Sequence, residues 1–183
     1  MTDSNAEDHV GAGHRWIKQG DYDLIRASVP IVCVDVLLRL AADPNQVGLI
    51  RRVTYDRKEG WCLVGGRVLL NESLREAVER QLRVSVPGVN PRMPTLGFVD
   101  MFEYFSAAGR GRLHDPRKHD IGLTFAVDCE GTGRPQGEAL EFRWWHRDEL
   151  AGLSFGFGHG EVVSSLIRAD DEGARQHRWG IGM

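Results

Sequence analysis

The sequence predicts a single α/β domain, built as a mixed β-sheet with helices on both faces. Strand-like apolar runs recur along most of the chain, and they surround one central amphipathic helix and one C-terminal helix. A length of 183 residues suits one domain. The chain has no internal repeat and no composition break that would separate two domains.

Three segments carry helix signals. The central one, 73–86, places apolar residues at i, i+4 and i+8 and is stopped by a Pro-Gly pair. A shorter helix is predicted over 16–28, followed by Pro30, and the last helix is predicted over 160–172.

The strands are predicted from runs of β-branched, aromatic and aliphatic residues bounded by turn residues. They occupy 31–40, 46–55, 61–64, 95–105, 120–129 and 141–146. A turn at 42–45 joins the first two, and the pair Gly65–Gly66 ends the third. The loop 106–119, which contains two histidines, is interpreted as solvated, with a metal or general-base role as the alternative.

Composition excludes several classes of function. The formal charge is −3, from 23 basic and 26 acidic residues, which is too balanced for a nucleic-acid-binding surface. The longest apolar run, 29–38, is interrupted by Asp35 and is far too short to span a membrane. Three widely spaced cysteines match no metal or redox motif. We therefore expect a soluble, cytoplasmic protein with free thiols and without a nucleic-acid or membrane partner.

The ends of the chain are predicted to lie outside the folded domain. Residues 1–13 are small and polar, with no apolar core that would make a signal peptide, and we expect them to be disordered. The domain is expected to occupy 14–172, and 173–183 to form a loose tail.

The segment WCLVGGRVLLNESLREAVERQL resembles the Nudix hydrolases. Their conserved box begins Gly-x5-Glu-x7-Arg, and Gly66, Glu72 and Arg80 match these three positions in register. The segment is most similar to the GDP-mannose mannosyl hydrolases, whose box is already eroded. The stretches VPIVCVDVLL and EFRWWHRDEL also agree with that branch, so the resemblance covers roughly residues 15–168.

This resemblance implies a Nudix-type α/β/α sandwich with a mixed β-sheet. It also implies a small nucleoside-diphosphate-linked ligand such as a nucleotide sugar, Mg²⁺ or Mn²⁺ as cofactor, and a homodimer. In such a site the metal neutralises the diphosphate and activates water, while arginines hold the phosphate oxygens. The family binds its metal mainly through glutamates in the second half of the box helix.

The second half of the box is degenerate in this chain. The positions of the family's glutamates hold Gln81, Val84 and Ser85, which makes the cofactor doubtful. Glu76 and Glu79 do not replace them. At 100° per residue these two glutamates point nearly opposite to the box face, where each has an arginine four residues on.

Other carboxylates are therefore the candidates for metal binding and catalysis. The resemblance places Glu138 at a metal-ligand position of the mannosyl hydrolases, and Ala139 where that branch has a histidine base. We expect Glu138 and Glu141 to serve as metal ligands and catalytic groups, with Asp100 and Glu103 as alternatives.

The candidate ligand-binding residues surround the glycine pair. Arg52 and Arg67 match positions that contact the diphosphate in the resembling branch, and Gly65 and Gly66 form the adjoining loop. Asp35 is a further candidate catalytic residue, because a carboxylate within an apolar strand is costly unless it has a partner.

Arg51 neighbours Arg52 on a predicted strand and should face the other way. Glu72 and Arg80 are interpreted as a structural pair that shapes the box. These residues support two hypotheses. The first is a divergent, metal-dependent hydrolase of a nucleoside-diphosphate-linked substrate. The second is a catalytically inactive module that binds such a ligand, which the missing helix carboxylates favour.

Overall fold

The structure, a computed structural model, describes residues 17–92 and 97–171. The predicted disordered segment 1–13 and the predicted tail 173–183 lie outside these residues. The first two residues of the strand expected over 95–105 also lie outside them. No helix within the described ranges is long and apolar enough to cross a membrane.

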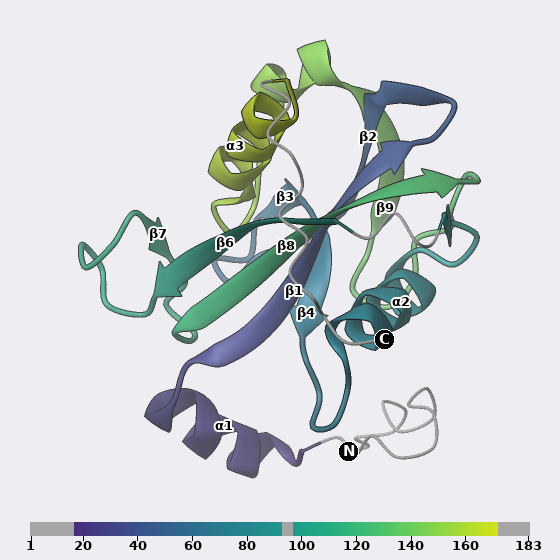
Figure 1. Ribbon diagram of the computed structural model, residues 1–183. Coiled ribbons are helices and arrows are strands. Elements are labelled where there is room, and N and C mark those ends of the chain that lie inside the picture. Colours follow the sequence, from purple (N-terminus) through teal and green to yellow (C-terminus); the bar gives the residue numbers. More distant parts are fainter. Residues whose placement is uncertain (1–16, 93–96, 172–183) are drawn as a thin grey trace.

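The described residues form a curled mixed sheet of nine strands, with α2 and α3 on opposite sides of it (Figure 1). This arrangement confirms the predicted α/β/α sandwich. The helices are α1 Gln19–Ser28, α2 Leu74–Ser85 and α3 His159–Asp171, with a 3₁₀-helix at Arg147–Gly152. The strands are β1 Ile31–Leu40, β2 Asp43–Val53, β3 Glu59–Cys62, β4 Val64–Arg67, β5 Asn90–Pro91, β6 Gly97–Phe105, β7 Leu113–His114, β8 Asp120–Glu130 and β9 Glu141–His146.

Strand β1 organises the sheet. It pairs in parallel with β8 along its whole length, from Ile31 opposite Asp120 to Leu40 opposite Cys129. On its other edge it pairs antiparallel first with β4 and then with β2. On this edge, β1 therefore changes its partner strand partway along its length, from β4 to β2. Asp35 lies opposite Gly65 near this change.

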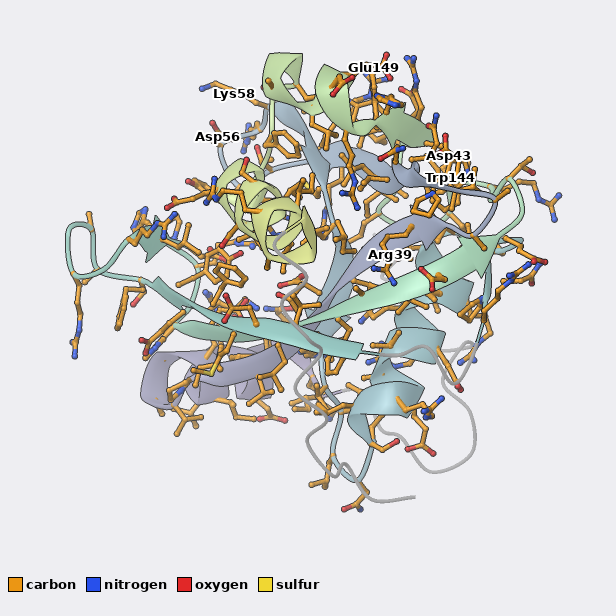
Figure 2. The ribbon with its side chains drawn as sticks, turned by 45° about the horizontal axis from the view of Figure 1, so that its top comes forward. Arg39, Asp43, Asp56, Lys58, Trp144 and Glu149 are labelled. Carbon is orange, nitrogen blue, oxygen red and sulfur yellow. The ribbon has the colours of Figure 1, made fainter. Side chains whose placement is uncertain are left out.

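The core is divided by the sheet into two clusters. Val34, Val36 and Leu38 of β1 pack on the side of α2, whereas Leu37 packs with Val162 and other residues on the side of α3. This alternation follows from the two-residue period of a strand. Figure 2 shows the surrounding shell of polar side chains, including the exposed Asp56, Lys58 and Glu149 at the outer edge of the molecule.

Two local predictions are wrong. The segment expected as a turn at 42–45 belongs mostly to β2, because the hairpin turns already at 41–42. The pair Gly65–Gly66 does not end a strand but lies inside β4. A Cβ on Gly65 would collide with the Asp35 carboxylate and the Val34 carbonyl, so glycine is needed for the close approach of β4 to β1.

Candidate functional site

A cavity of about 520 Å³ lies between α1, β2, β4 and α2. A smaller polar chamber of about 70 Å³ adjoins it and extends toward α3. The two share five lining residues: Arg52, Gly65, Gly66, Arg117 and Lys118. Three of these five are cationic, and each is paired with a carboxylate, Arg52 with Glu138, Arg117 with Asp115 and Lys118 with Asp120.

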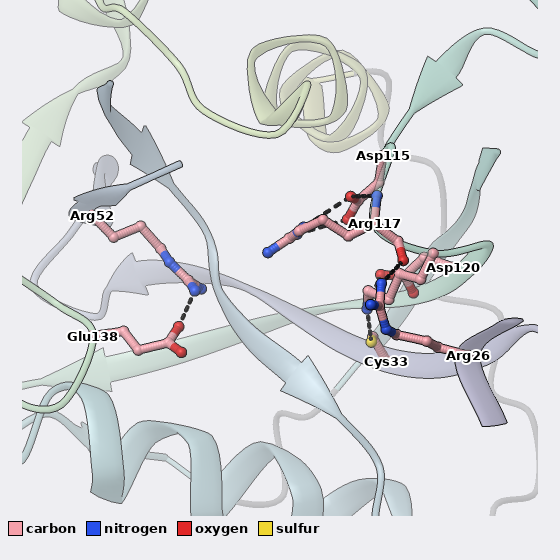
Figure 3. Close-up of polar contacts among 8 residues, drawn as sticks. Arg26, Cys33, Arg52, Asp115, Arg117, Asp120 and Glu138 are labelled. Carbon is pink, nitrogen blue, oxygen red and sulfur yellow. Dashed lines mark hydrogen bonds and ion pairs between the residues drawn. The ribbon is translucent and has the colours of Figure 1, made fainter. Parts of the chain in front are cut away.

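Strand β2 directs Arg52 into the cavity. Its guanidinium forms an ion pair with Glu138 (Figure 3). It also lies 5.1 Å from the centre of the Phe157 ring. The Arg52 Nε atom is buried and has no hydrogen-bond partner among the described residues. Arg51 faces the other side of the sheet, as predicted from strand alternation. It pairs there with Glu59 at 3.1 Å and with Glu141 at 2.9 Å.

Strand β4 brings Gly65, Gly66 and Arg67 to the same cavity. The Arg67 guanidinium lies 4.3 Å from the centre of the Tyr22 ring on α1. A Cβ on Gly66 would collide with the amide group of Gln81, so this glycine lets β4 lie close to α2. The structure thus brings together all four residues that the sequence assigns to ligand binding.

Two further cations come from the loop that precedes β8, which the sequence had indicated to be solvated. Arg117 binds Asp115 through two hydrogen bonds, of 2.9 and 2.6 Å, and lies 4.5 Å from the Phe157 ring centre. The Lys118 Nζ atom lies 2.5 Å from Asp120 Oδ2 and 3.0 Å from Cys33 Sγ (Figure 3). The one signal for these cations in the sequence is that Arg117 and Lys118 form a basic pair just before a predicted strand.

The chamber contains Asp35, which is 8% exposed. Burial raises the pKa of Asp35 to about 7, and the Asp120 carboxylate adds to the rise, while Lys118 and Arg52 oppose it. The Tyr104 hydroxyl and Asp120 Oδ1 are also buried, without hydrogen-bond partners in the described part of the chain. Near neutral pH the chamber therefore contains a carboxyl group that can both donate and accept a proton.

His159, at the start of α3, closes the chamber. Its Nδ1 atom accepts a hydrogen bond of 2.9 Å from the backbone N–H of Leu63. Burial, together with the nearby Arg52 and Arg117, lowers the pKa of His159 to about 3. The ring is therefore neutral, with its proton on Nε2.

The retained and the degenerate parts of the box have different surroundings at helix α2. Glu72 and Arg80 form a buried ion pair with contacts of 2.6 and 2.8 Å, and Arg80 also donates to the backbone carbonyl of Arg67 at 2.8 Å. The face turned to the cavity carries Gln81, Val84 and Ser85, as the helical period predicts. Glu76 instead belongs to the capping box with Ser73 at the start of the helix.

The described residues do not fit a divalent metal ion. None of their histidine, cysteine, aspartate and glutamate side chains form a group of three that could bind one. Glu138 lines the cavity but is paired with Arg52, and Glu141 is paired with Arg51 and does not line it. Glu103 is bound to His119 at 2.9 Å, and the remaining candidate, Asp100, accepts from the backbone N–H of Met101. The expected pair of metal ligands, Glu138 and Glu141, is therefore not brought together at the cavity.

Comparison with known proteins finds relatives in both sequence and fold. It is 29% identical to the ADP-ribose pyrophosphatase of Methanocaldococcus jannaschii over 140 residues, which is 76% of this chain and 74% of that protein. The structure is similar to that of a possible asymmetric diadenosine tetraphosphate hydrolase from Jonesia denitrificans. The TM-score is 0.68 and the identity 28%, over 78% of this chain and 96% of the other.

A third similarity, to the Nudix domain of Shewanella oneidensis NrtR complexed with ADP ribose, concerns the fold. Here the TM-score is 0.59 and the identity 18%, over 85% of this chain and 99% of that domain. The family model for a domain of unknown function, DUF4916, matches residues 12–169. The chain belongs to this DUF4916 family, and its fold is that of the Nudix hydrolases.

Proposed function

We propose that this protein binds a small nucleoside-diphosphate-linked molecule, such as ADP-ribose, with its phosphates on Arg52, Arg67, Arg117 and Lys118. The observation that carries the proposal is the convergence of these four cations on one cavity. Guanidinium groups bind phosphate oxygens through paired, charge-assisted hydrogen bonds. A cavity of about 520 Å³ is within the range of small-molecule sites, roughly 300–1,000 Å³.

We infer further that the cations of the protein, rather than a divalent metal, neutralise the diphosphate. The α2 residues that line the cavity are Gln81, Val84 and Ser85, with an amide, an isopropyl and a hydroxyl group, and Arg80, which is paired with Glu72. The carboxylates at the site are engaged by cations: Glu138 pairs with Arg52 and Asp120 with Lys118. Nudix hydrolases generally use Mg²⁺ or Mn²⁺, so metal-independent binding separates this chain from the common pattern of the fold.

Hydrolysis is the second candidate function. It is favoured by Asp35, whose carboxyl group lies beside the phosphate-binding cations and titrates near neutral pH. Once ionised, this carboxylate is a candidate general base for an attacking water molecule. Nucleotide sugars, the substrates of the branch that the sequence resembles, remain the second ligand class. The homodimer and the cytoplasmic location stay predictions.

The test compares ligand binding with and without metal. ADP-ribose, GDP-mannose and inorganic phosphate are titrated calorimetrically into the protein, in EDTA and in Mg²⁺, and the products are separated by chromatography. We expect a nucleotide to bind in EDTA without turnover, and to stabilise the protein by about 2.7 kcal/mol at a concentration 100 times its Kd. Binding that requires Mg²⁺ would refute the metal-independent site, and turnover would establish the second candidate.

Variants at two adjacent arginines provide the matched comparison. Arg52→Met removes a cation that lines the cavity, whereas Arg51→Met removes the neighbouring cation from the opposite side of the same strand. We expect the first substitution to weaken nucleotide binding at least tenfold and the second to leave it unchanged. Equal losses of affinity in the two variants would contradict the placement of the phosphates at Arg52.

A further inference from the structure

Helix α1 is attached to the domain in an unusual way. None of its residues is buried, and the Leu24 side chain is 70% exposed. A helix of ten residues is marginal in water, and such helices normally gain stability by packing an apolar face on the core. The contribution of α1 to the protein therefore depends on its polar side, which faces the domain.

The side of α1 that faces the domain includes Gln19, Tyr22 and Arg26, which share one helical face. Gln19 and Tyr22 line the large cavity. Arg26 donates a hydrogen bond of 2.5 Å to the backbone carbonyl of Arg117, one of the proposed phosphate-binding residues. This face of α1 thus forms a wall of the ligand cavity and is tied to the loop that supplies its cations.

Tyr22 is the only aromatic residue among the described residues that line the large cavity. The Arg67 guanidinium lies over its ring, 4.3 Å from the ring centre. The aromatic ring nearest the other cations, Phe157, is in contact with the guanidinium groups of both Arg52 and Arg117. Tyr22 therefore places an aromatic ring at the α1 end of the cavity, in contact with a proposed phosphate-binding arginine.

We propose that Tyr22 stacks on the base of the bound nucleotide, so that the nucleoside end of the ligand lies against α1. The inference rests on the proposed function and specifies the orientation of the ligand and the need for a base. A base stacks on an aromatic side chain whatever its hydrogen-bonding groups. With the base against Tyr22, Arg67 is placed to reach from the base to the phosphates. The part of the ligand beyond the diphosphate then points to the polar chamber.

The test separates the base from the phosphates by comparing ADP with inorganic pyrophosphate in EDTA. The wild-type protein is expected to bind ADP more tightly than pyrophosphate. Tyr22→Ala should weaken ADP binding roughly 5- to 150-fold, the range for loss of one base–aromatic stack, and leave pyrophosphate binding unchanged. Tyr22→Trp should retain ADP binding and report it through quenching of the new indole. Leu24→Ala, on the exposed side of the same helix, is the control and should bind both ligands like the wild type.

The outcomes distinguish this inference from the proposed function. If the wild type binds neither ADP nor pyrophosphate, the proposed function is overturned. If it binds both equally well, or if Tyr22→Ala binds ADP like the wild type, the stacking is overturned while the phosphate site stands. If Tyr22→Ala weakens ADP and pyrophosphate to the same extent, Tyr22 acts by positioning Arg67 and does not contact the base. Thermal unfolding of each variant verifies that it is folded.

Discussion

Replacing Arg80 with methionine should destabilise the protein strongly, because it leaves Glu72 as an uncompensated buried carboxylate. The Arg80 side chain is 6% exposed and the Glu72 side chain 1% exposed, and two contacts of 2.6 and 2.8 Å join them. Removing one partner of such a buried pair costs about 3–5 kcal/mol. For a domain of this size, 1 kcal/mol shifts Tm by about 2–4 °C, so we expect Tm to fall by roughly 6–20 °C.

Urea unfolding followed by far-ultraviolet circular dichroism measures this effect. The double substitution Glu72→Gln with Arg80→Met removes the stranded charge and should recover more than half of the lost free energy. Arg92→Met is the matched control, because Arg92 and Glu130 form an exposed pair and its loss should cost less than about 1 kcal/mol. If Arg80→Met unfolds at the wild-type urea concentration, or if the double variant is no more stable than the single one, the buried pair does not hold the box together.

Three further predictions concern pH and metal. An unfolded Asp35 ionises near pH 3.8, but the folded one stays protonated to about pH 7, so the stability that Asp35 contributes is lost as pH rises through this window. In urea titrations the wild type should therefore lose on the order of 4 kcal/mol relative to Asp35→Asn between pH 4 and 7. His159 has the opposite sign: its pKa falls from 6.5 to about 3, so stability is lost as pH falls below 6.5, and His159→Gln should lessen that loss. Ser85→Glu places a carboxylate on the cavity face of α2, and calorimetry should detect tighter Mn²⁺ binding than in the wild type; no change would mean that more than one ligand is missing.

The parts of the site that the sequence predicted come from local periodicity and from the resemblance to the Nudix box. A helix fixes the directions of its side chains at 100° per residue, so Gln81, Val84 and Ser85 share one face, and the resemblance to the Nudix box indicated that this face meets the site. A strand alternates its side chains, so the opposite directions of Arg51 and Arg52 were predictable in the same way. No knowledge of tertiary contacts was needed for either prediction.

The parts that the sequence did not predict depend on pairing between distant strands. Arg117 and Lys118 reach the cavity because β8 runs parallel to β1, which sets the loop before β8 beside the start of β1. Glu141 lies directly opposite Arg51 in the pairing of β9 with β2, and it therefore faces away from Arg52. Both facts follow from the register of the paired strands. The spacing of residues within a connecting loop, such as the 14-residue loop 106–119, does not determine that register.

The electrostatics of the cavity follow from which half of the box this chain retains. Gly66, Glu72 and Arg80 shape the loop between β4 and α2, and this half is present. The half of the box that would hold a metal carries neutral side chains here, Gln81, Val84 and Ser85. Carboxylates in a metal site repel phosphate until the metal neutralises them, so their loss removes that repulsion along with the metal ligands. The nearby arginines then act on a phosphate directly, in a partly buried setting where each charge is weakly screened. Under the proposed function, loss of the metal ligands and retention of the arginines thus favour binding of the diphosphate over its metal-assisted cleavage.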